Sequence, residues 1–377
     1  MMRLKYKSGL MLMAGLLLLV LLAGCGPIGQ SIAQGWAGTA VSGNTLLVGS
    51  KEGSLVAIDA TSHNRKWLDV KFEMQQSTGF GCAPSSTGVA IYGTPAIWGD
   101  LAFVAGYDGK VYAIVVETGQ ERWVQPRQGN ETLGKFVGSP VVVGDRLFIG
   151  SATGGIYALD ADTGDLVWST PLDDEIWSSP EISGGVVYIG SFDKKLYALD
   201  AETGAVLWNY ETEGAIAAAP LVHEGRVYIG SFDRNMYAIN TANGSLAWKT
   251  AEPADNWFWT RPILVDGVLY AGSLDGKVYT FNAHNGEQTA SFDLGSPVTT
   301  APVISDGAII VATKEGRIFS IDPVTHQQRM LRDLEKEIFA PILADGNTLY
   351  VHTDDNVLYA IEGTSGLTLW SLPLNSE

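Results

Sequence analysis

Residues 179–208 read SPEISGGVVYIGSFDKKLYALDAETGAVLW, and this stretch decides the fold because it recurs along the chain. The copy before it is SPVVVGDRLFIGSATGGIYALDADTGDLVW, at 139–168, and the copy after it is APLVHEGRVYIGSFDRNMYAINTANGSLAW, at 219–248. Successive copies are 40 residues apart. A fixed period of this length indicates a small structural unit that is repeated side by side.

The same frame fits five further segments, so that eight copies extend from about residue 36 to residue 372. Two positions identify each copy. The first is aromatic in most copies and holds Val56, Tyr112, Tyr157, Tyr197, Tyr237, Tyr279, Phe319 and Tyr359. The second is a Trp in most copies and holds Trp67, Trp123, Trp168, Trp208, Trp248, Ala290, Met330 and Trp370.

Each copy contains short β-branched and aromatic runs separated by Gly and Asp, which is the pattern of strands and turns. Four strands in a repeat of about 40 residues make one propeller blade, and closing the blades into a ring protects their edges. The sequence therefore predicts an all-β fold, an eight-bladed β-propeller with four antiparallel strands per blade, as a single domain over residues 36–377. One helical turn is expected over 331–338, in a connection between blades.

The turns have their own pattern. Asp-Gly at 108–109 and at 275–276 suits tight hairpins, and the next turn reads Asp-Ala-x-Thr-Gly, as at 160–164 and 200–204. His63 and His326 replace the Gly of this turn in copies one and seven. Because His tolerates positive φ better than most residues, we interpret both as turn residues rather than as ligands.

The amino-terminal residues have the layout of an export signal: basic residues, an apolar run from Leu10 to Leu22, and small residues before Cys25. This end resembles the lipobox of bacterial lipoproteins, in which the Cys receives the lipid. The resemblance predicts a signal peptide over 1–24 and a lipidated Cys25 with a short tether over 25–35. The alternative, a membrane-spanning anchor, is less favoured because the apolar run is shorter than the roughly 20 residues that a bilayer requires.

The chain carries a formal net charge of −17, and removal of the signal would make it more negative. Such a charge repels phosphate backbones, so nucleic-acid binding is disfavoured. With Cys25 lipidated, Cys82 would be the only thiol, which excludes an intramolecular disulfide. We interpret Cys82 as a small buried side chain rather than a reactive one.

The motif Asp-Ala-x-Thr-Gly-x-x-x-Trp at 160–168 and 200–208 resembles the repeat of the pyrroloquinoline-quinone (PQQ) propeller superfamily. The resemblance covers nearly all of the chain after the signal. It implies that the repeated Trp docks between neighbouring blades and that copies six and seven, which lack it, depart from the pattern. This structural role falls on Trp67, Trp123, Trp168, Trp208, Trp248 and Trp370.

The superfamily contains quinoprotein dehydrogenases and also non-enzymatic propeller lipoproteins of the BamB type. The chain resembles the second group in its lipobox, short spacer and eight blades. It also lacks the adjacent Cys pair and the long insertions of the dehydrogenases. Its histidines are scattered, without zinc spacing, and its glycines follow the blade period instead of forming a phosphate loop. We therefore predict no catalytic residues, no cofactor and no metal site.

A partner-binding face is predicted from the connections between blades. Most are short, but Trp67 to Pro95 spans 28 residues and Trp123 to Pro140 spans 17, and loops longer than a fold needs are often functional. Large aromatic residues stand just before the inner strands of several copies, where we expect them around one mouth of the ring. They are Trp36, Tyr92, Trp177 and Trp259, with Trp257 and Phe258 beside the last. The alternative is that these side chains only plug the central channel.

Three functions follow from these observations. The favoured one is an exported lipoprotein that binds envelope proteins as a scaffold, as a monomer or within a hetero-complex. It would be anchored to the cell membrane or, in a host that has one, to the periplasmic face of the outer membrane. The second is a small-molecule sensor or carrier, and the third is a PQQ-dependent dehydrogenase or its remnant.

Overall fold

The computed structural model describes residues 34–76, 85–127 and 132–375. Cys25 and Cys82, the signal and most of the tether lie outside these residues. The described residues form strands and turns and no helix, so the expected helical turn over 331–338 is wrong: this segment contains the end of a strand and a turn. No helix in the part of the chain that the structure describes is long and apolar enough to cross a membrane.

Eight four-stranded antiparallel sheets make up the fold, which confirms the predicted eight-bladed propeller. Blades 1 to 4 contain, in order, β1 (Thr39–Ser42), β2 (Thr45–Gly49), β3 (Ser54–Asp59) and β4 (Val70–Lys71); β7 (Ala96–Trp98), β8 (Leu101–Ala105), β9 (Val111–Val115) and β10 (Glu121–Gln125); β11 (Val141–Val143), β12 (Arg146–Gly150), β13 (Gly155–Asp160) and β14 (Leu166–Pro171); β15 (Glu181–Ser183), β16 (Val186–Gly190), β17 (Lys195–Asp200) and β18 (Val206–Glu211).

Blades 5 to 8 follow the same order. They contain β19 (Leu221–His223), β20 (Arg226–Gly230), β21 (Met236–Asn240) and β22 (Leu246–Lys249); β23 (Ile263–Val265), β24 (Val268–Gly272), β25 (Lys277–Asn282) and β26 (Gln288–Asp293); β27 (Val303–Ser305), β28 (Ala308–Ala312), β29 (Arg317–Ile321) and β30 (Gln328–Asp333); β31 (Leu343–Asp345), β32 (Thr348–His352), β33 (Val357–Glu362) and β34 (Thr368–Pro373). Two further strands, β5 (Glu73–Gln76) and β6 (Ser85–Gly88), pair only with each other.

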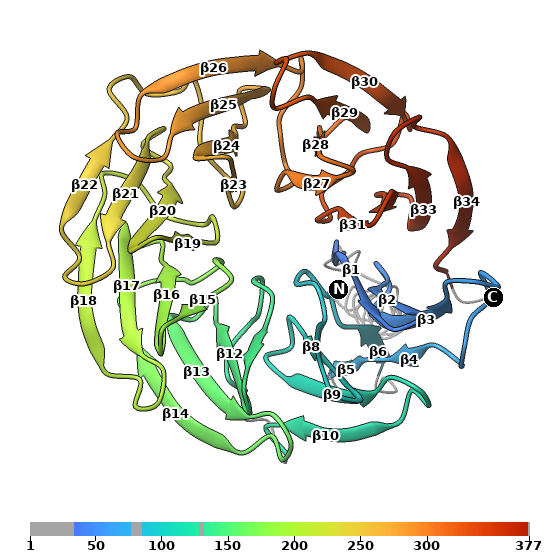
Figure 1. Ribbon diagram of the computed structural model, residues 1–377. Helices are drawn as coiled ribbons and strands as arrows, with labels where there is room; N and C mark the ends of the chain where they lie inside the picture. Colours follow the sequence, from blue (N-terminus) through green and yellow to red (C-terminus); the bar gives the residue numbers. More distant parts are fainter. Residues whose placement is uncertain (1–33, 77–84, 128–131, 376–377) are drawn as a thin grey trace, which may run out of the picture. The chain divides into compact units, whose positions relative to one another are not determined.

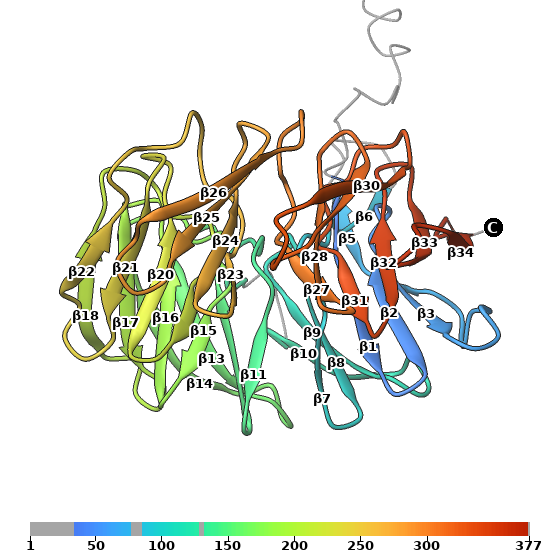
Figure 2. The same ribbon diagram turned by 45° about the horizontal axis from the view of Figure 1, so that its top comes forward.

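Within each blade the strands pair in sequence order, so every sheet is one continuous stretch of chain. The first strand of each blade lies nearest the centre of the ring and the fourth lies at the rim (Figure 1). The short hairpins between first and second strands, such as β1–β2 and β7–β8, point to one face of the ring (Figure 2). The connections that return from the rim to the next inner strand gather on the other face.

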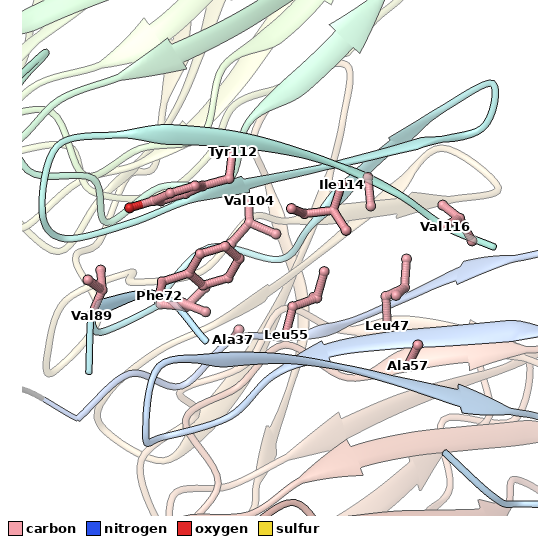
Figure 3. Close-up of a cluster of buried hydrophobic side chains, with 12 residues drawn as sticks. Ala37, Leu47, Leu55, Ala57, Phe72, Val89, Val104, Tyr112, Ile114 and Val116 are labelled. Atoms are coloured by element: carbon pink, nitrogen blue, oxygen red, sulfur yellow. The ribbon is translucent and has the colours of Figure 1, made fainter. Parts of the chain in front are cut away.

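The core consists of eight clusters of buried apolar side chains, each shared by two neighbouring blades. Figure 3 shows the cluster between blades 1 and 2, where Leu47 and Leu55 face Val104 and Ile114. Because a sheet can bury its faces only against other elements, each blade is stabilised by its two neighbours. The second and third strands of each blade supply most of these residues and are almost fully buried.

The turn predictions are confirmed. Gly109 and Gly276 have positive φ, and His63 and His326 adopt φ of 59° and 58° in the left-handed region. In the turn at 160–164, Asp160 Oδ1 accepts the backbone N–H of Thr163 at 2.9 Å. This bond lowers the pKa of Asp160. The recurring acids of these turns therefore have a structural explanation.

The ring closes between blade 8 and blade 1 without exchange of a strand, because both sheets are continuous in sequence. An apolar cluster joins β2 and β3 to β32, β33 and β34. The ring of His63 stacks on Trp370 with centroids 4.9 Å apart. Arg65 Nη2 donates to the carbonyl oxygen of Asn375 at 3.1 Å. Side-chain contacts, and not a shared sheet, hold this seam together.

Candidate functional site

The face that carries the long connections gathers aromatic side chains in a regular way. In blades 2 to 8 the connection before the inner strand forms a backbone hydrogen bond with the loop between second and third strands, as from Phe192 N–H to Glu175 O at 2.9 Å. The equivalent bond in blade 6 joins Leu274 N–H to Trp257 O at 2.9 Å. This bond places one side chain of the connection beside one side chain of the loop. The side chains from the connections and those from the loops together surround the mouth of the ring.

Blades 4, 5 and 6 contribute five rings, which we call the blade 4–6 stack: Trp177, Phe192, Phe232, Trp257 and Trp259. Phe232 is nearly parallel to Trp257, at 4.3 Å between centroids, and to Trp259, at 5.6 Å. Trp177 meets Trp259 edge-on at 6.1 Å and contacts Phe192 at 4.7 Å. Trp257 keeps 42 % of its surface exposed, while the other four are half-buried.

Carboxylates surround the blade 4–6 stack. Glu175 Oε2 accepts the indole N–H of Trp177 at 2.8 Å, which fixes the orientation of that ring. Asp255 pairs with Lys277 at 2.9 Å, and the hydrogen bond from this lysine lowers the pKa of Asp255. Asp173 pairs with Lys195 at 2.8 Å. The stack is thus an apolar patch within a polar rim of paired charges, an arrangement seen at protein-binding surfaces.

A second aromatic group, the Trp36 group, lies on blades 8, 1 and 2 and consists of Trp36, Tyr92, Tyr107 and Phe339. Trp36 contacts Tyr92 edge-on at 4.5 Å and Phe339 at 5.7 Å. Tyr92 meets Tyr107 at 5.4 Å, and burial raises the pKa of Tyr92. Lys135 Nζ lies 4.7 Å above the ring of Tyr107, which is a cation–π distance.

The predicted face residues thus fall into two groups, Trp36 with Tyr92, and Trp177 with Trp257 and Trp259. Phe258 belongs to neither group. Its side chain is 1 % exposed and packs against Tyr279 and Phe281 in the core between blades 5 and 6. It cannot contact a partner, because alternation along the chain turns it inward where its two neighbours turn outward.

Four residues at the mouth were not predicted: Tyr107, Phe192, Phe232 and Phe339. The motif Gly-Ser-Phe-Asp occurs twice, at 190–193 and 230–233, and could have identified Phe192 and Phe232. Phe339 stands two residues before Pro341, whereas the aromatics used to find the mouth stand three residues before the residue that opens the inner strand: Trp36, Tyr92, Trp177 and Trp259. A search anchored on that spacing selects the buried Ile338 instead.

The repeated indoles lie at the junctions between blades. Five of them donate their N–H to a carbonyl oxygen of the next blade, at 2.9–3.2 Å: Trp67 to Val116, Trp123 to Ala161, Trp168 to Ala201, Trp208 to Thr241 and Trp248 to Ala283. The turn glycine of the next blade packs on each of these rings, as Gly286 does on Trp248. Trp370 stacks on His63 of blade 1 in place of such a glycine.

No group of three or more His, Cys, Asp or Glu side chains within residues 34–76, 85–127 and 132–375 has the arrangement to hold a metal ion. Two acids of the mouth are held by lysines, Asp255 by Lys277 and Asp173 by Lys195.

Two family models match the sequence. The one described as "Beta-alanine-activating enzyme, beta-propeller" matches residues 137–377, and the one described as "Outer membrane protein assembly factor BamB" matches residues 30–168. No curated protein sequence matches the chain.

Solved structures share the fold. BamB from Moraxella catarrhalis has 19 % identity and a TM-score of 0.66, covering 89 % of this chain and 96 % of that one. The computationally designed Ika8 protein has 18 % identity and a TM-score of 0.68, with 90 % and 97 % covered. A europium-containing methanol dehydrogenase has 14 % identity and a TM-score of 0.66, with 87 % and 83 % covered. At these identities the likeness concerns the fold alone. By its sequence the chain belongs to the family of propeller domains described as "Beta-alanine-activating enzyme, beta-propeller", within the PQQ-like β-propeller superfamily.

Proposed function

We propose that this protein is an exported, lipid-anchored scaffold that binds other envelope proteins through the aromatic mouth of its propeller and catalyses no reaction. The observation that carries the proposal is the blade 4–6 stack, with Trp257 exposed and four half-buried rings beside it. Aromatic side chains that are part-exposed at the centre of a polar rim are the usual energetic centre of protein interfaces. The match to a BamB family model over residues 30–168 supports a role of this kind.

The position of the stack also supports it. Rings that only plugged a channel would be enclosed, whereas Trp257 and Trp36 expose 42 % and 37 % of their surfaces. Acidic side chains at the rim, such as Asp173 and Asp255, form ion pairs that water screens, so they add specificity more than affinity. A partner with apolar side chains flanked by basic ones fits this surface.

The experiment is affinity capture from detergent-solubilised envelope of the producing organism, with mass spectrometry of the captured proteins. We expect Trp177→Ala/Trp257→Ala/Trp259→Ala to lose partners that the unaltered protein retains. The matched control is Leu207→Ala/Leu246→Ala, which removes exposed apolar side chains at the rim of blades 4 and 5. Circular dichroism and thermal unfolding verify that both variants are folded. Equal capture by the triple variant and the unaltered protein would refute the aromatic mouth as the binding surface.

The dehydrogenase alternative has a direct test. Purified protein is incubated with PQQ and either calcium or a lanthanide, and reduction of an artificial electron acceptor is followed with primary alcohols as substrates. We expect neither a bound chromophore nor dye reduction. Either one would overturn the non-enzymatic part of the proposal.

A further inference from the structure

A pocket of about 210 Å³ opens at the seam where the ring closes. Blade 1 and the segment before it contribute Trp36 and Lys51, and blade 8 with its connection contributes Glu337, Phe339 and Asp354. Its volume is below the roughly 300–1,000 Å³ of ordinary cofactor and drug sites, so a ligand no larger than a single amino acid fits it.

The apolar part of the pocket comes from two rings. Trp36 and Phe339 stand with centroids 5.7 Å apart and planes tilted by 37°. At this separation a third ring cannot enter between them, so together they form one continuous apolar wall. Trp36 is partly exposed and Phe339 half-buried, so the wall is accessible from solvent. An apolar or aromatic side chain of a ligand can lie against it.

The polar part carries both signs of charge. The ammonium of Lys51 donates to the backbone carbonyl of Asp354. Within the described part of the chain it has no carboxylate partner, unlike Lys314 at the same repeat position, which pairs with Glu337 at 3.6 Å. A half-buried cation without a counter-ion favours an anionic group of a ligand. Two carboxylates lie on the same pocket wall: Asp354, which forms no ion pair among the described residues, and Glu337, which Lys314 already pairs with at 3.6 Å. Of the two, Asp354 is the one left to favour a cationic group.

Behind the pocket the wall is held by hydrogen bonds. His352 is buried, with Nδ1 3.1 Å from the carbonyl oxygen of Ala37 and Nε2 3.2 Å from Oδ1 of Asn356. The same Oδ1 accepts the backbone N–H of Lys51 at 3.0 Å, which holds the base of the lysine. Preorganised groups of this kind reduce the entropy lost on binding.

We infer that this seam pocket binds a free zwitterionic α-amino acid with an apolar or aromatic side chain, with its carboxylate at Lys51, its ammonium at Asp354, and its side chain on Trp36 and Phe339. The binding is independent of the protein-binding surface of blades 4–6, which shares none of these residues. Size, apolar wall and paired opposite charges each select this class. A net anion would leave the Asp354 carboxylate without a charged partner, and a net cation would leave Lys51 without one.

The test uses the purified full chain and calorimetric titration, with L-phenylalanine as the probe and L-leucine as a second one. N-acetyl-L-phenylalanine lacks the ammonium, and phenethylamine lacks the carboxylate. We expect L-phenylalanine to bind at one site and each truncated analogue to bind about tenfold or more weakly, because each loses one charge-assisted contact. Binding of either analogue as tight as that of L-phenylalanine would overturn the zwitterion assignment.

Two variants assign the charges. Lys51→Met is expected to weaken L-phenylalanine binding about tenfold and to leave the binding of phenethylamine, which lacks the carboxylate, unchanged. Asp354→Asn is expected to weaken L-phenylalanine binding about tenfold and to leave the binding of N-acetyl-L-phenylalanine, which lacks the ammonium, unchanged. Lys51→Arg should retain binding, which separates loss of charge from disturbance of the seam. Lys194→Met and Glu202→Gln, at exposed positions of blade 4, are the matched controls. Absence of L-phenylalanine and L-leucine binding at about 10 mM, where even a millimolar dissociation constant is nearly saturated, would refute the proposal.

Discussion

The contact between an indole and the turn glycine of the next blade can be tested at Trp248 and Gly286. Gly286 has φ of +75°, and a Cβ added there would lie 2.6 Å from both Cδ2 and Cε3 of Trp248. Gly286→Ala therefore meets two penalties. The left-handed backbone costs about 1–2 kcal/mol for a residue with a Cβ, and overpacking against the ring costs about 1–3 kcal/mol more.

Blade 6 offers a matched control in Gly267. This glycine has φ of +77° but no atom within 4 Å of an added Cβ. Gly267→Ala should therefore lower the free energy of unfolding by the backbone penalty alone, about 1–2 kcal/mol. The difference between the two glycine variants measures the contact with the indole.

The double variant completes the test. Trp248→Ala removes a buried indole and its N–H bond to Ala283 O at 2.9 Å, with an expected loss of about 3–5 kcal/mol. In Trp248→Ala/Gly286→Ala the clash is absent, so the combined loss should fall short of the sum by about 1–3 kcal/mol. Equilibrium urea unfolding, followed by circular dichroism after reversibility is verified, gives the four free energies. Additivity within about 0.5 kcal/mol would refute the proposed packing.

Three further results are expected. Burial lowers the pKa of His352 below its usual 6.5, so as the pH decreases the unfolded chain takes up a proton before the folded chain does, and the free energy of unfolding falls below about pH 6.5. His352→Asn should make this fall smaller, as measured by urea unfolding at pH 7.5 and 5.5. An equal fall in the variant and the unaltered protein would contradict the prediction. Tyr237→Phe removes the hydroxyl that donates to Asp233 Oδ2 at 2.5 Å and should lower the free energy of unfolding by about 1.5–3 kcal/mol in urea unfolding. Tyr157→Phe should lower it less, because blade 3 has Thr153 in place of that Asp. Cys25→Ser should move the protein from the membrane fraction to the soluble fraction of the cell envelope on immunoblots, and unchanged fractionation would exclude the lipid anchor.

The blade count and the turns were predictable because each depends on a local pattern that is repeated eight times. Details of pairing were not predictable where one copy departs from the others. In the regular blades 3 and 5, a β-bulge precedes the Trp and pairs it with an Ala of the third strand, as in Ala158 with Trp168. Blade 7 has Met330 at this position, and there the irregularity is displaced, so that Met330 pairs with Phe319 and is exposed.

The candidate site was only half predictable for a related reason. Trp177, Trp257 and Trp259 are close in sequence to the inner strands, so their repeat positions identified the mouth. Phe192 and Phe232 come from a different loop of each blade, and only the hydrogen bond between that loop and the connection brings the two sets together. Contacts between residues from separate repeats depend on the curvature of the ring, which the period alone does not specify.

The seam between blades 8 and 1 connects stability to the inferred ligand. Every other junction joins blades that are consecutive in the chain, whereas this one joins residues about 300 apart in sequence, and closing so long a loop has an entropic cost. An amino acid in the seam pocket would contact Trp36 and Lys51 from blade 1 and Phe339 and Glu337 from the connection to blade 8. The pocket therefore exists only in the closed ring. Binding to the folded state alone raises the free energy of unfolding by an amount that grows with ligand concentration, about 2.7 kcal/mol at 100 times the dissociation constant. L-Phenylalanine should therefore raise the unfolding temperature of the unaltered protein and of the Gly267→Ala variant alike, because Gly267 lies in blade 6, away from the seam. At the same concentration Lys51→Met, which binds about tenfold more weakly, should gain about 1.4 kcal/mol, roughly half as much. This smaller gain would make the seam, and not general solvent effects of the amino acid, the origin of the shift.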